Sequence, residues 1–244
     1  MAAARPILLL TRPQASSEAF WYALPEDIRA AVDILINPLL SIHFKGPLPD
    51  LSRLGGLIFT SANALDAYIA LNGRVLNVPV IAVGAATGKA ARDFGFDVDV
   101  AGGTAEHLIA HVLERGYKGP LLHLRGEIAI GDIAQRLTAA GVATDDAVLY
   151  RQKPKPFTAP TRVALSQDRP VVAPIFSPRT AVQFGRESKG LANIGCAAIS
   201  QAVADALPVA NARRTQIASQ PDRAGMVELV TNMIADAAGL ERRL

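Results

Sequence analysis

Short apolar runs alternate with segments of helical periodicity along the whole sequence. The runs that read as strands are PILLL (6–10), LIFT (57–60), PVIAV (79–83), PLLHL (120–124), VVAPIF (171–176) and CAAI (196–199). After most of these runs comes a turn of small or hydroxyl-bearing residues and then an amphipathic helix. This order is typical of a parallel sheet covered by helices, so we expect an α/β fold.

The two halves of the sequence resemble each other. LIFTSANALDAY (57–68) aligns with PIFSPRTAVQFG (174–185), and VIAVGAATGKAAR (80–92) aligns with GCAAISQAVADAL (195–207). An internal repeat of roughly 115 residues indicates duplication of one α/β unit. A chain of 244 residues with 50% apolar composition can build a core for each copy. We therefore expect two similar parallel-sheet α/β domains.

Two extended stretches do not fit inside a compact unit. They are ILINPLLSIHF (34–44) and DAVLYRQKPKPF (146–157), and each ends a half-repeat. Pro154 and Pro156 favour extended backbone and oppose helix. We interpret the stretches as a two-stranded linker, so that the chain leaves the first domain, builds the second and returns. The first domain would then be discontinuous.

Composition limits the classes of partner and compartment. The formal net charge is +3, the basic residues are scattered and aromatic residues make up 5% of the chain, which suits an acidic small molecule better than a nucleic acid. The single cysteine, Cys196, excludes an intramolecular disulfide, and its apolar surroundings favour a buried structural thiol over a nucleophile. The N-terminal run ILLL is too short for a signal peptide or a membrane span. We expect a cytoplasmic protein without a membrane segment, and a monomer, since no oligomerisation stripe is evident.

The segment AVGAATGKAAR (82–92) has the appearance of a phosphate-binding loop. That loop needs four residues between its glycines and a Ser or Thr after the lysine, because the hydroxyl binds magnesium. Here Gly84 and Gly88 enclose three residues, and Ala90 stands where the hydroxyl should be. We therefore interpret the segment as a strand-to-helix turn. Lys89 is then either a solvated helix residue or a screened contribution to substrate attraction.

One helix face carries a possible metal pair. His107 and His111 are four residues apart in TAEHLIAHVLE, and Glu114 follows one turn later. The alternative is a solvated polar face opposite the apolar positions of the same helix, which we favour because no further ligand cluster is apparent. We expect no metal.

Polar residues follow the strands at their carboxyl ends, where parallel sheets bind ligands and helix N-termini present free N–H groups. Capping alone explains any single hydroxyl at such a position, but the repetition favours a cleft that binds carboxylates or phosphates. Within it, Arg125, Glu127 and Asp132 could support acid–base work, although Glu127 can equally complement a helix dipole. The residues expected to line this cleft are Arg12, Arg125, Thr11, Thr60, Ser61, Thr87 and Ser177.

Tyr150 lies in AVLYRQ, where the chain crosses between the expected domains. Its hydroxyl can point into the cleft as a hydrogen-bond donor or weak acid. It can equally serve as an amphipathic filler between the domains.

These pieces together resemble the uroporphyrinogen-III synthase family over essentially the full length of the chain. The matching segments are LLLTRP, LIFTSANAL (57–65), VIAVGAATGKAARDFGF (80–96) followed by GGTAEHL, LLHLRGE, VLYRQ, IFSPRTAVQF and ASQPDRAGMVELV. No single segment is diagnostic, and the resemblance rests on their order, spacing and coverage.

The resemblance implies a fold and a reaction. Family members have two α/β domains, which corresponds to residues 1–36 with 157–244 in the first domain, 43–148 in the second, and linker strands at 37–42 and 149–156. They are lyases of heme biosynthesis that use no cofactor. They convert hydroxymethylbilane, a linear tetrapyrrole rich in carboxylates, into uroporphyrinogen III with loss of water, inverting ring D through a spiro intermediate. A transient contact with the preceding pathway enzyme would protect that unstable substrate.

The resemblance also implies site residues. Tyr150 corresponds to the family tyrosine that is the leading candidate for assisting departure of hydroxide. The implied substrate-binding residues are Arg12, Thr60, Ser61, Gly84, Thr87, Arg125, Gly126, Ser177 and Ser200.

One segment departs from the family pattern. The family repeats its Gly-x-x-Thr turn in the terminal half, but in AAISQAVADAL Ser200 replaces the glycine and Val203 the threonine. If the threonine hydroxyl is essential, the chain would be impaired, which would suit a non-catalytic tetrapyrrole-binding or regulatory relative. If the turn supplies backbone N–H groups, Ser200 can cap the helix and activity survives, which we favour. A two-domain sugar or anion receptor is a further alternative.

Overall fold

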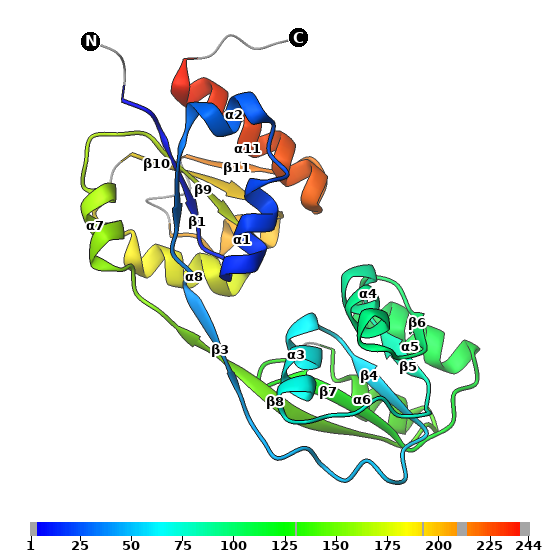
Figure 1. The fold of residues 1–244 in the computed structure, drawn as a ribbon. Coiled ribbons are helices and arrows are strands. Elements are labelled where there is room, and N and C mark those ends of the chain that lie inside the picture. Colours follow the sequence, from blue (N-terminus) through cyan, green and yellow to red (C-terminus); the bar gives the residue numbers. More distant parts are fainter. Residues whose placement is uncertain (1–3, 130, 192, 209–213, 240–244) are drawn as a thin grey trace. The chain divides into compact units, whose positions relative to one another are not determined.

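The computed structural model describes residues 4–129, 131–191, 193–208 and 214–239. The chain forms two compact units, one from Met1–Ser41 and Pro154–Leu244 and the other from Ile42–Lys153. Each unit contains a sheet with helices packed on it (Figure 1). Neighbouring strands run parallel in both sheets apart from one antiparallel pair at the edge of the second sheet, which confirms the predicted α/β fold.

The first unit is built around a sheet of five strands in the order β11-β10-β9-β1-β2. These strands are β1 (Ile7–Leu10), β2 (Asp33–Ile36), β9 (Val171–Ile175), β10 (Ile194–Ala198) and β11 (Thr215–Ile217). The helices are α1 (Gln14–Trp21), α2 (Glu26–Ala31), α7 (Ala159–Leu165), α8 (Pro178–Glu187), α9 (Gln201–Asp205) and α11 (Arg223–Ala238).

The winding direction of the first sheet reverses between β1 and β9. From β1 the chain moves outward to β2, and from β9 it moves outward through β10 to β11. β1 pairs with β9 only at Ile7 and Leu8, whereas β10 pairs with β9 along its whole length. Pro174 near the end of β9 has no N–H to donate. The carboxyl ends of β1 and β9 are therefore not joined, and such a reversal is where open α/β sheets bind ligands.

The second unit has a sheet of six strands in the order β3-β8-β7-β4-β5-β6. The strands are β3 (Leu40–Phe44), β4 (Gly56–Phe59), β5 (Val80–Ala82), β6 (Val98–Val100), β7 (Leu121–Gly126) and β8 (Thr144–Pro154). The helices are α3 (Ala62–Ala70), α4 (Ala85–Phe94), α5 (Ala105–Glu114) and α6 (Ile133–Ala139). Its winding reverses between β4 and β7.

The two expected linker stretches form strands of the second sheet. Lys45 N–H donates to Leu149 O over 2.7 Å, and Lys155 N–H donates to Leu39 O over 2.8 Å. These bonds pair β3 with β8 in opposite directions, since one residue number rises as the other falls. β8 is a single strand of 11 residues that continues from the sheet into the return crossing.

Each sheet is covered on both faces, which explains why its strands read as continuous apolar runs. In the first unit α7, α8 and α9 cover one face and α1, α2 and α11 the other. In the second unit α3 and α4 cover one face, and α5 and α6 the other. The side chains of ILLL in β1 and GLIF in β4 are all buried. Cys196 is buried within the first core, as its apolar surroundings predicted.

Helix ends also follow the sequence. α4 ends at Gly95, which holds the left-handed conformation at φ 111° that glycine adopts without strain.

Among the described residues, no helix has the length and apolar character needed to cross a membrane.

Candidate functional site

The reversal point of the second sheet brings Ser61 and Tyr150 together. Ser61 follows β4 and caps α3, where its Oγ accepts the N–H of Ala64 over 3.3 Å. The same Oγ lies 3.0 Å from the hydroxyl of Tyr150. Tyr150 is 8% exposed, so its ring is fixed by packing while its hydroxyl is held at a helix N-terminus.

Tyr150 reaches this position because β8 shifts register against β7. Arg125 pairs with Val148, but the next residue, Gly126, pairs with Tyr150 rather than Leu149. Such an irregularity re-aims a side chain, and here both Leu149 and Tyr150 pack into the core beneath α3 and α4.

Gly126 provides the room for the tyrosine ring. A Cβ at position 126 would lie 2.6 Å from Cζ and 2.9 Å from the hydroxyl oxygen of Tyr150, closer than real contacts allow. Gly126 was expected to bind substrate, and in the structure it lies against the back of the tyrosine.

Thr60 binds a buried histidine. Its Oγ1 lies 3.1 Å from Nε2 of His123, which stands in the middle of β7 and is 2% exposed. Burial, assisted by the charge of Arg125, lowers the pKa of His123 to about 4. The imidazole is therefore neutral at pH 7, and one hydroxyl of the expected site is held by a side chain that sequence reasoning did not identify.

The neutral state of His123 predicts a pH-dependent stability. Above the ordinary pKa of 6.5, His123 is neutral in both the folded and the unfolded chain. Between pH 6.5 and about 4 only the unfolded chain binds the proton, so the free energy of unfolding falls as the pH falls, by up to about 3 kcal/mol. His123→Gln should lose this component. Urea unfolding of both proteins at pH 7 and pH 4 measures it, and an equal pH dependence of the two would contradict the prediction.

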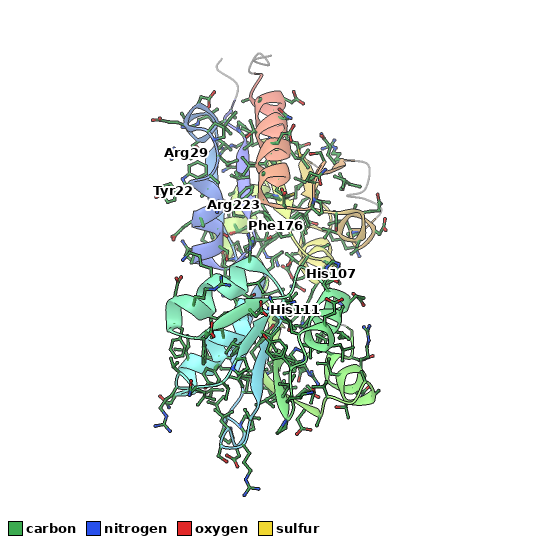
Figure 2. The ribbon with its side chains drawn as sticks, turned by 90° about the vertical axis from the view of Figure 1, so that its right-hand side faces the viewer. Tyr22, Arg29, His107, His111, Phe176 and Arg223 are labelled. Atoms are coloured by element: carbon green, nitrogen blue, oxygen red, sulfur yellow. The ribbon has the colours of Figure 1, made fainter. Side chains whose placement is uncertain are left out.

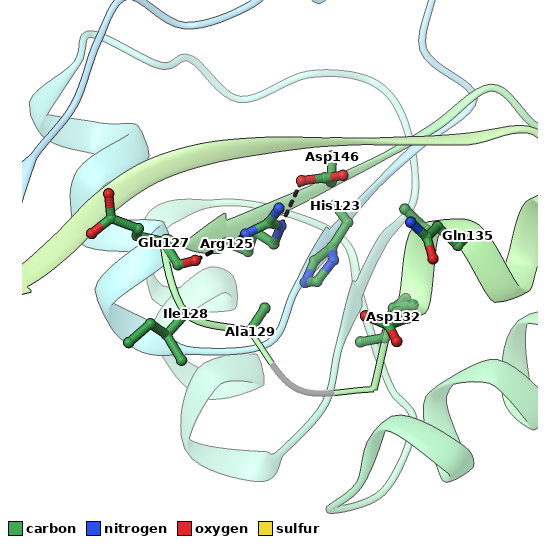
Figure 3. A pocket seen from close by; sticks show the side chains of 10 residues that line it. His123, Arg125, Glu127, Ile128, Ala129, Asp132, Gln135 and Asp146 are labelled. Carbon is green, nitrogen blue, oxygen red and sulfur yellow. Dashed lines mark hydrogen bonds and ion pairs between the residues drawn. The ribbon is translucent and has the colours of Figure 1, made fainter. Parts of the chain in front are cut away.

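Arg125 is paired within its own unit. Its Nε lies 2.5 Å from Oδ2 of Asp146, and its Nη1 donates to the carbonyl of Gly126 over 3.0 Å. Arg125 and Asp146 line a pocket of about 410 Å³ next to α6. His123 and Gln135 also line this pocket (Figure 3). Arg125, which lies within β7, is thus held by an acidic side chain of the neighbouring strand β8.

Two acidic candidates near this pocket, Glu127 and Asp132, do not cap a helix with their side chains. Glu127 lies in the loop after β7, outside any helix, and pairs with Lys45 over 3.7 Å, so the dipole interpretation of Glu127 is wrong. Asp132 precedes α6 in the left-handed conformation at φ 43° and makes no side-chain cap bond.

The turn before α4 is more open than expected. Gly84 occupies the N-cap with φ −136° and ψ 160°, an extended conformation that any residue adopts, and a Cβ there would meet nothing within 4 Å. The backbone at Gly84 therefore does not require glycine. Thr87 is 7% exposed and lies in the first turn of α4, and Lys89 is exposed and pairs with Asp93 over 2.6 Å.

In the first unit the expected residues lie beside the reversal point. The Arg12 guanidinium lies over the Phe176 ring, 4.5 Å from its centre. Ser177 caps α8 by accepting the Thr180 N–H over 3.1 Å. Thr11 is 3% exposed and its hydroxyl is buried, so it does not line an open surface.

Ser200 departs from the expected capping. It stands at the N-cap of α9, and its carbonyl accepts from Val203 and Ala204, but its side chain makes no cap bond. The expectation that the Ser200 hydroxyl caps the helix is therefore wrong. Val203 is 1% exposed within the first core, where an apolar side chain of threonine shape fits.

The histidine pair on α5 does not form a metal site. His111 Nε2 lies 2.7 Å from Asp99 Oδ2, which also accepts the Tyr117 hydroxyl over 3.0 Å. Among the described residues there is no group of three or more potential metal ligands. His111 is thus a fixed contact between α5 and β6 rather than a solvated residue.

A family model confirms the resemblance seen in the sequence. The model of uroporphyrinogen-III synthase HemD matches residues 29–228, which is most of the chain. This chain belongs to the uroporphyrinogen-III synthase family. Members of the family are cyclising lyases of heme biosynthesis. None of the curated proteins compared with the chain matches it.

Solved members of the uroporphyrinogen-III synthase family share the fold. The Helicobacter pylori enzyme is 20% identical, with a TM-score of 0.68, and the match covers 94% of this chain and 100% of that one. A mutant of the Thermus thermophilus enzyme is 14% identical, with a TM-score of 0.54, over 94% of this chain and 99% of that one. At these identities the comparison supports the architecture and leaves the site to the residues themselves.

In this member of the uroporphyrinogen-III synthase family, sequence reasoning overlooked residues that hydrogen-bond to the predicted site residues and hold them in place. Asp146 holds Arg125 and His123 holds Thr60. The signal for Asp146, the second residue of DDAVLY, was a charge in a strand that is otherwise half apolar. His123 had a similar signal, because a lone histidine in the apolar run PLLHL must find a hydrogen-bond partner when buried.

Proposed function

We propose that this chain converts hydroxymethylbilane into uroporphyrinogen III. The observation that carries the proposal is the Tyr150 hydroxyl, which is held 3.0 Å from Ser61 Oγ at the reversal point of the second sheet. A phenol placed at a helix N-terminus is a hydrogen-bond donor whose direction is set before substrate arrives. Tyr150 is accordingly the proposed catalytic residue.

The proposed first step is loss of the terminal hydroxyl. The C–O bond of the hydroxymethyl group breaks, the Tyr150 hydroxyl gives its proton to the leaving oxygen, and water departs from an azafulvenium cation. Ser61 Oγ, as the hydrogen-bond partner of Tyr150, supports the phenolate that forms. The positive charge of the azafulvenium and the negative charge of the phenolate appear together, so neither needs a separate counter-ion.

The following steps form and break carbon–carbon bonds within the substrate. The substituted carbon of ring D attacks the cation to give the spiro intermediate, which fragments and recloses with ring D reversed. Loss of the final ring proton to the Tyr150 phenolate restores the phenol. The balance is one water lost and no electrons exchanged, so the reaction requires no redox partner and we propose no cofactor.

The proposed binding groups are those at the carboxyl ends of the strands. Arg12, Thr60, Ser61, Thr87, Arg125, Ser177 and Ser200 are retained as candidates, with Gly84 and Gly126. Backbone N–H groups at the starts of α3, α4 and α8 are suited to substrate carboxylates. The open space at Gly84 leaves room for a ligand to approach the start of α4. Arg125, held by Asp146, serves as a directed donor.

The proposal also covers the oligomeric state, the cellular compartment and the partner enzyme. We propose that the chain acts as a monomer in the cytoplasm, on a substrate handed over by the preceding pathway enzyme. An acidic substrate is consistent with the formal net charge of +3.

The decisive experiment is an isomer assay. Purified protein is given freshly prepared hydroxymethylbilane, and the oxidised products are separated by chromatography. We expect the type III isomer to predominate. Exclusive formation of the symmetric type I isomer, which arises spontaneously, would overturn the proposal, and binding of product without turnover would indicate a non-catalytic relative.

A further inference from the structure

We propose that Arg12, Arg223 and Phe176 form a binding subsite for a carboxylate of the tetrapyrrole substrate. The inference rests on the proposed function for the nature of its ligand. It assigns a role to Arg223 and Phe176, which lie in the matching segments ASQPDRAGMVELV and IFSPRTAVQF but are not among the site residues that the resemblance implies.

The position of the Arg12 guanidinium is energetically unfavourable for a charged group. Its guanidinium carbon lies over the Phe176 ring, 4.5 Å from the ring centre, and Phe176 in turn packs edge-on against Phe20, with ring centres 5.2 Å apart. The ring is fixed by this second contact, so the guanidinium cannot leave without exposing apolar surface. Stacking also leaves the N–H groups at the edge of the guanidinium plane available to an acceptor.

Arg223 places a second positive charge beside the first. It donates to the carbonyl of Ala19 in α1 and lies near Phe176 in the first unit (Figure 2). The proximity of the two arginines is also evident from electrostatics, because burial and the charge of Arg223 together lower the pKa of Arg12. Two like charges at close range repel each other unless an anion lies between them.

The position of Arg223 in its helix adds to this imbalance. Arg223 is the first residue of α11, a helix of 16 residues whose N-terminal end carries the positive pole of its dipole. The N-cap Asp222 already supplies an acidic side chain there, since its Oδ1 accepts the Gly225 N–H over 2.9 Å, and Arg223 adds a basic one. Within the described residues neither Arg12 nor Arg223 takes part in an ion pair. A bound anion would offset the repulsion between the two arginines and the burial of Arg12.

The location of Arg12 and Phe176 and the shape of the guanidinium favour a carboxylate as the bound anion. Arg12 follows β1 and Phe176 follows β9, so the group lies where the first sheet reverses its winding and its two strands are not joined. Guanidinium groups bind planar carboxylates through paired N–H donors, and the Phe176 ring offers an apolar wall to a pyrrole. An acetate or propionate arm of a pyrrole presents both features.

Arg29 provides a matched comparison in the same unit. Its guanidinium also lies over an aromatic ring, that of Tyr22 at 5.8 Å, and also donates to a backbone carbonyl, that of Leu24. Arg29 therefore reproduces both the stacking on an aromatic ring and the bond to a backbone carbonyl, and its substitution serves as the control.

The test compares Arg12→Met, Arg223→Met and Arg29→Met with the unchanged protein. Methionine keeps an unbranched apolar stem and removes the charge and the N–H donors of the guanidinium, so Arg223→Met and Arg29→Met each also lose one bond to a backbone carbonyl. Two quantities are measured for each protein: KM and kcat with hydroxymethylbilane, and the rise in Tm caused by citrate as a carboxylate probe. We expect Arg12→Met and Arg223→Met each to raise KM about tenfold to a hundredfold with kcat little changed, and to lose most of the citrate effect. Arg29→Met should retain both.

The two readouts separate failure of the subsite from failure of the proposed function. An active protein whose KM is unchanged in both variants would overturn the subsite and leave the synthase activity standing, even if the citrate effect were lost. If the unchanged protein forms no type III isomer, the proposed function fails, and the citrate effect alone then decides whether the arginines bind carboxylate. A citrate effect equal in all four proteins would overturn the subsite in either case.

Discussion

Replacing Tyr150 with phenylalanine is expected to lower kcat for type III formation by about two to four orders of magnitude. A positioned acid contributes about that much to a reaction whose leaving group must accept a proton. The ring would stay in place, because Gly126 and the core beneath α3 hold it from behind. Only the hydroxyl and its 3.0 Å contact with Ser61 would be lost. The fraction of type I isomer should rise, since spontaneous closure continues at its own rate.

Tyr68→Phe is the matched control for this experiment. Tyr68 is also buried in the second unit, and its hydroxyl donates to the Arg74 carbonyl over 2.7 Å. Each variant loses one buried hydrogen bond, so each should lower the free energy of unfolding by about 1 kcal/mol. Single-turnover kinetics and urea unfolding of both variants check the prediction. Unchanged turnover in Tyr150→Phe would remove Tyr150 from the mechanism.

Replacing Gly126 with alanine is expected to have the second largest effect. The added Cβ would lie 2.6 Å from Cζ of Tyr150, so the ring must move or β7 must shift. Overpacking of this kind costs about 1–3 kcal/mol of stability. Displacing the hydroxyl by about 1 Å lowers kcat roughly a hundredfold. Gly103→Ala is the control, because a Cβ at that position meets nothing within 4 Å.

A double-mutant cycle tells whether Gly126 acts through Tyr150. If it does, Gly126→Ala should lower kcat strongly in the unchanged protein and hardly at all in Tyr150→Phe, while its effect on stability persists in both. Equal factors in the two backgrounds would show that Gly126 acts on the substrate directly, as a substrate-binding residue would.

The sequence was a good guide to the layers of the fold. Runs such as ILLL and GLIF are apolar without alternation because both faces of each sheet are covered, and this pattern requires a parallel sheet between helices. The serines at helix starts were also well predicted for Ser61 and Ser177, whose side chains both bond to the third residue of the helix. These features depend on neighbours a few residues away.

The features that the sequence could not supply depend on pairing between distant segments. The orientation of Tyr150 follows from a register shift between β7 and β8, and no local pattern in AVLYRQ predicts this shift. The pairing of Arg125 with Asp146 was not predicted, because Asp146 lies in another strand. Ser200 has the residue type and the position of a cap, yet its side chain makes no cap bond to α9. Residue type is thus a weaker guide than geometry at these positions.

The discontinuity of the first unit has a consequence for synthesis on the ribosome. β1 belongs between β2 and β9, and β9 is made only after the whole of Ile42–Lys153. The strands of that inserted segment find all their partners within it, so it can fold while β1 and β2 still lack the rest of their sheet. Leu8 and Leu10 of β1 can pack early against α1 and α2, but the opposite face of β1, with Ile7 and Leu9, waits for helices α7, α8 and α9, which are made after the inserted segment.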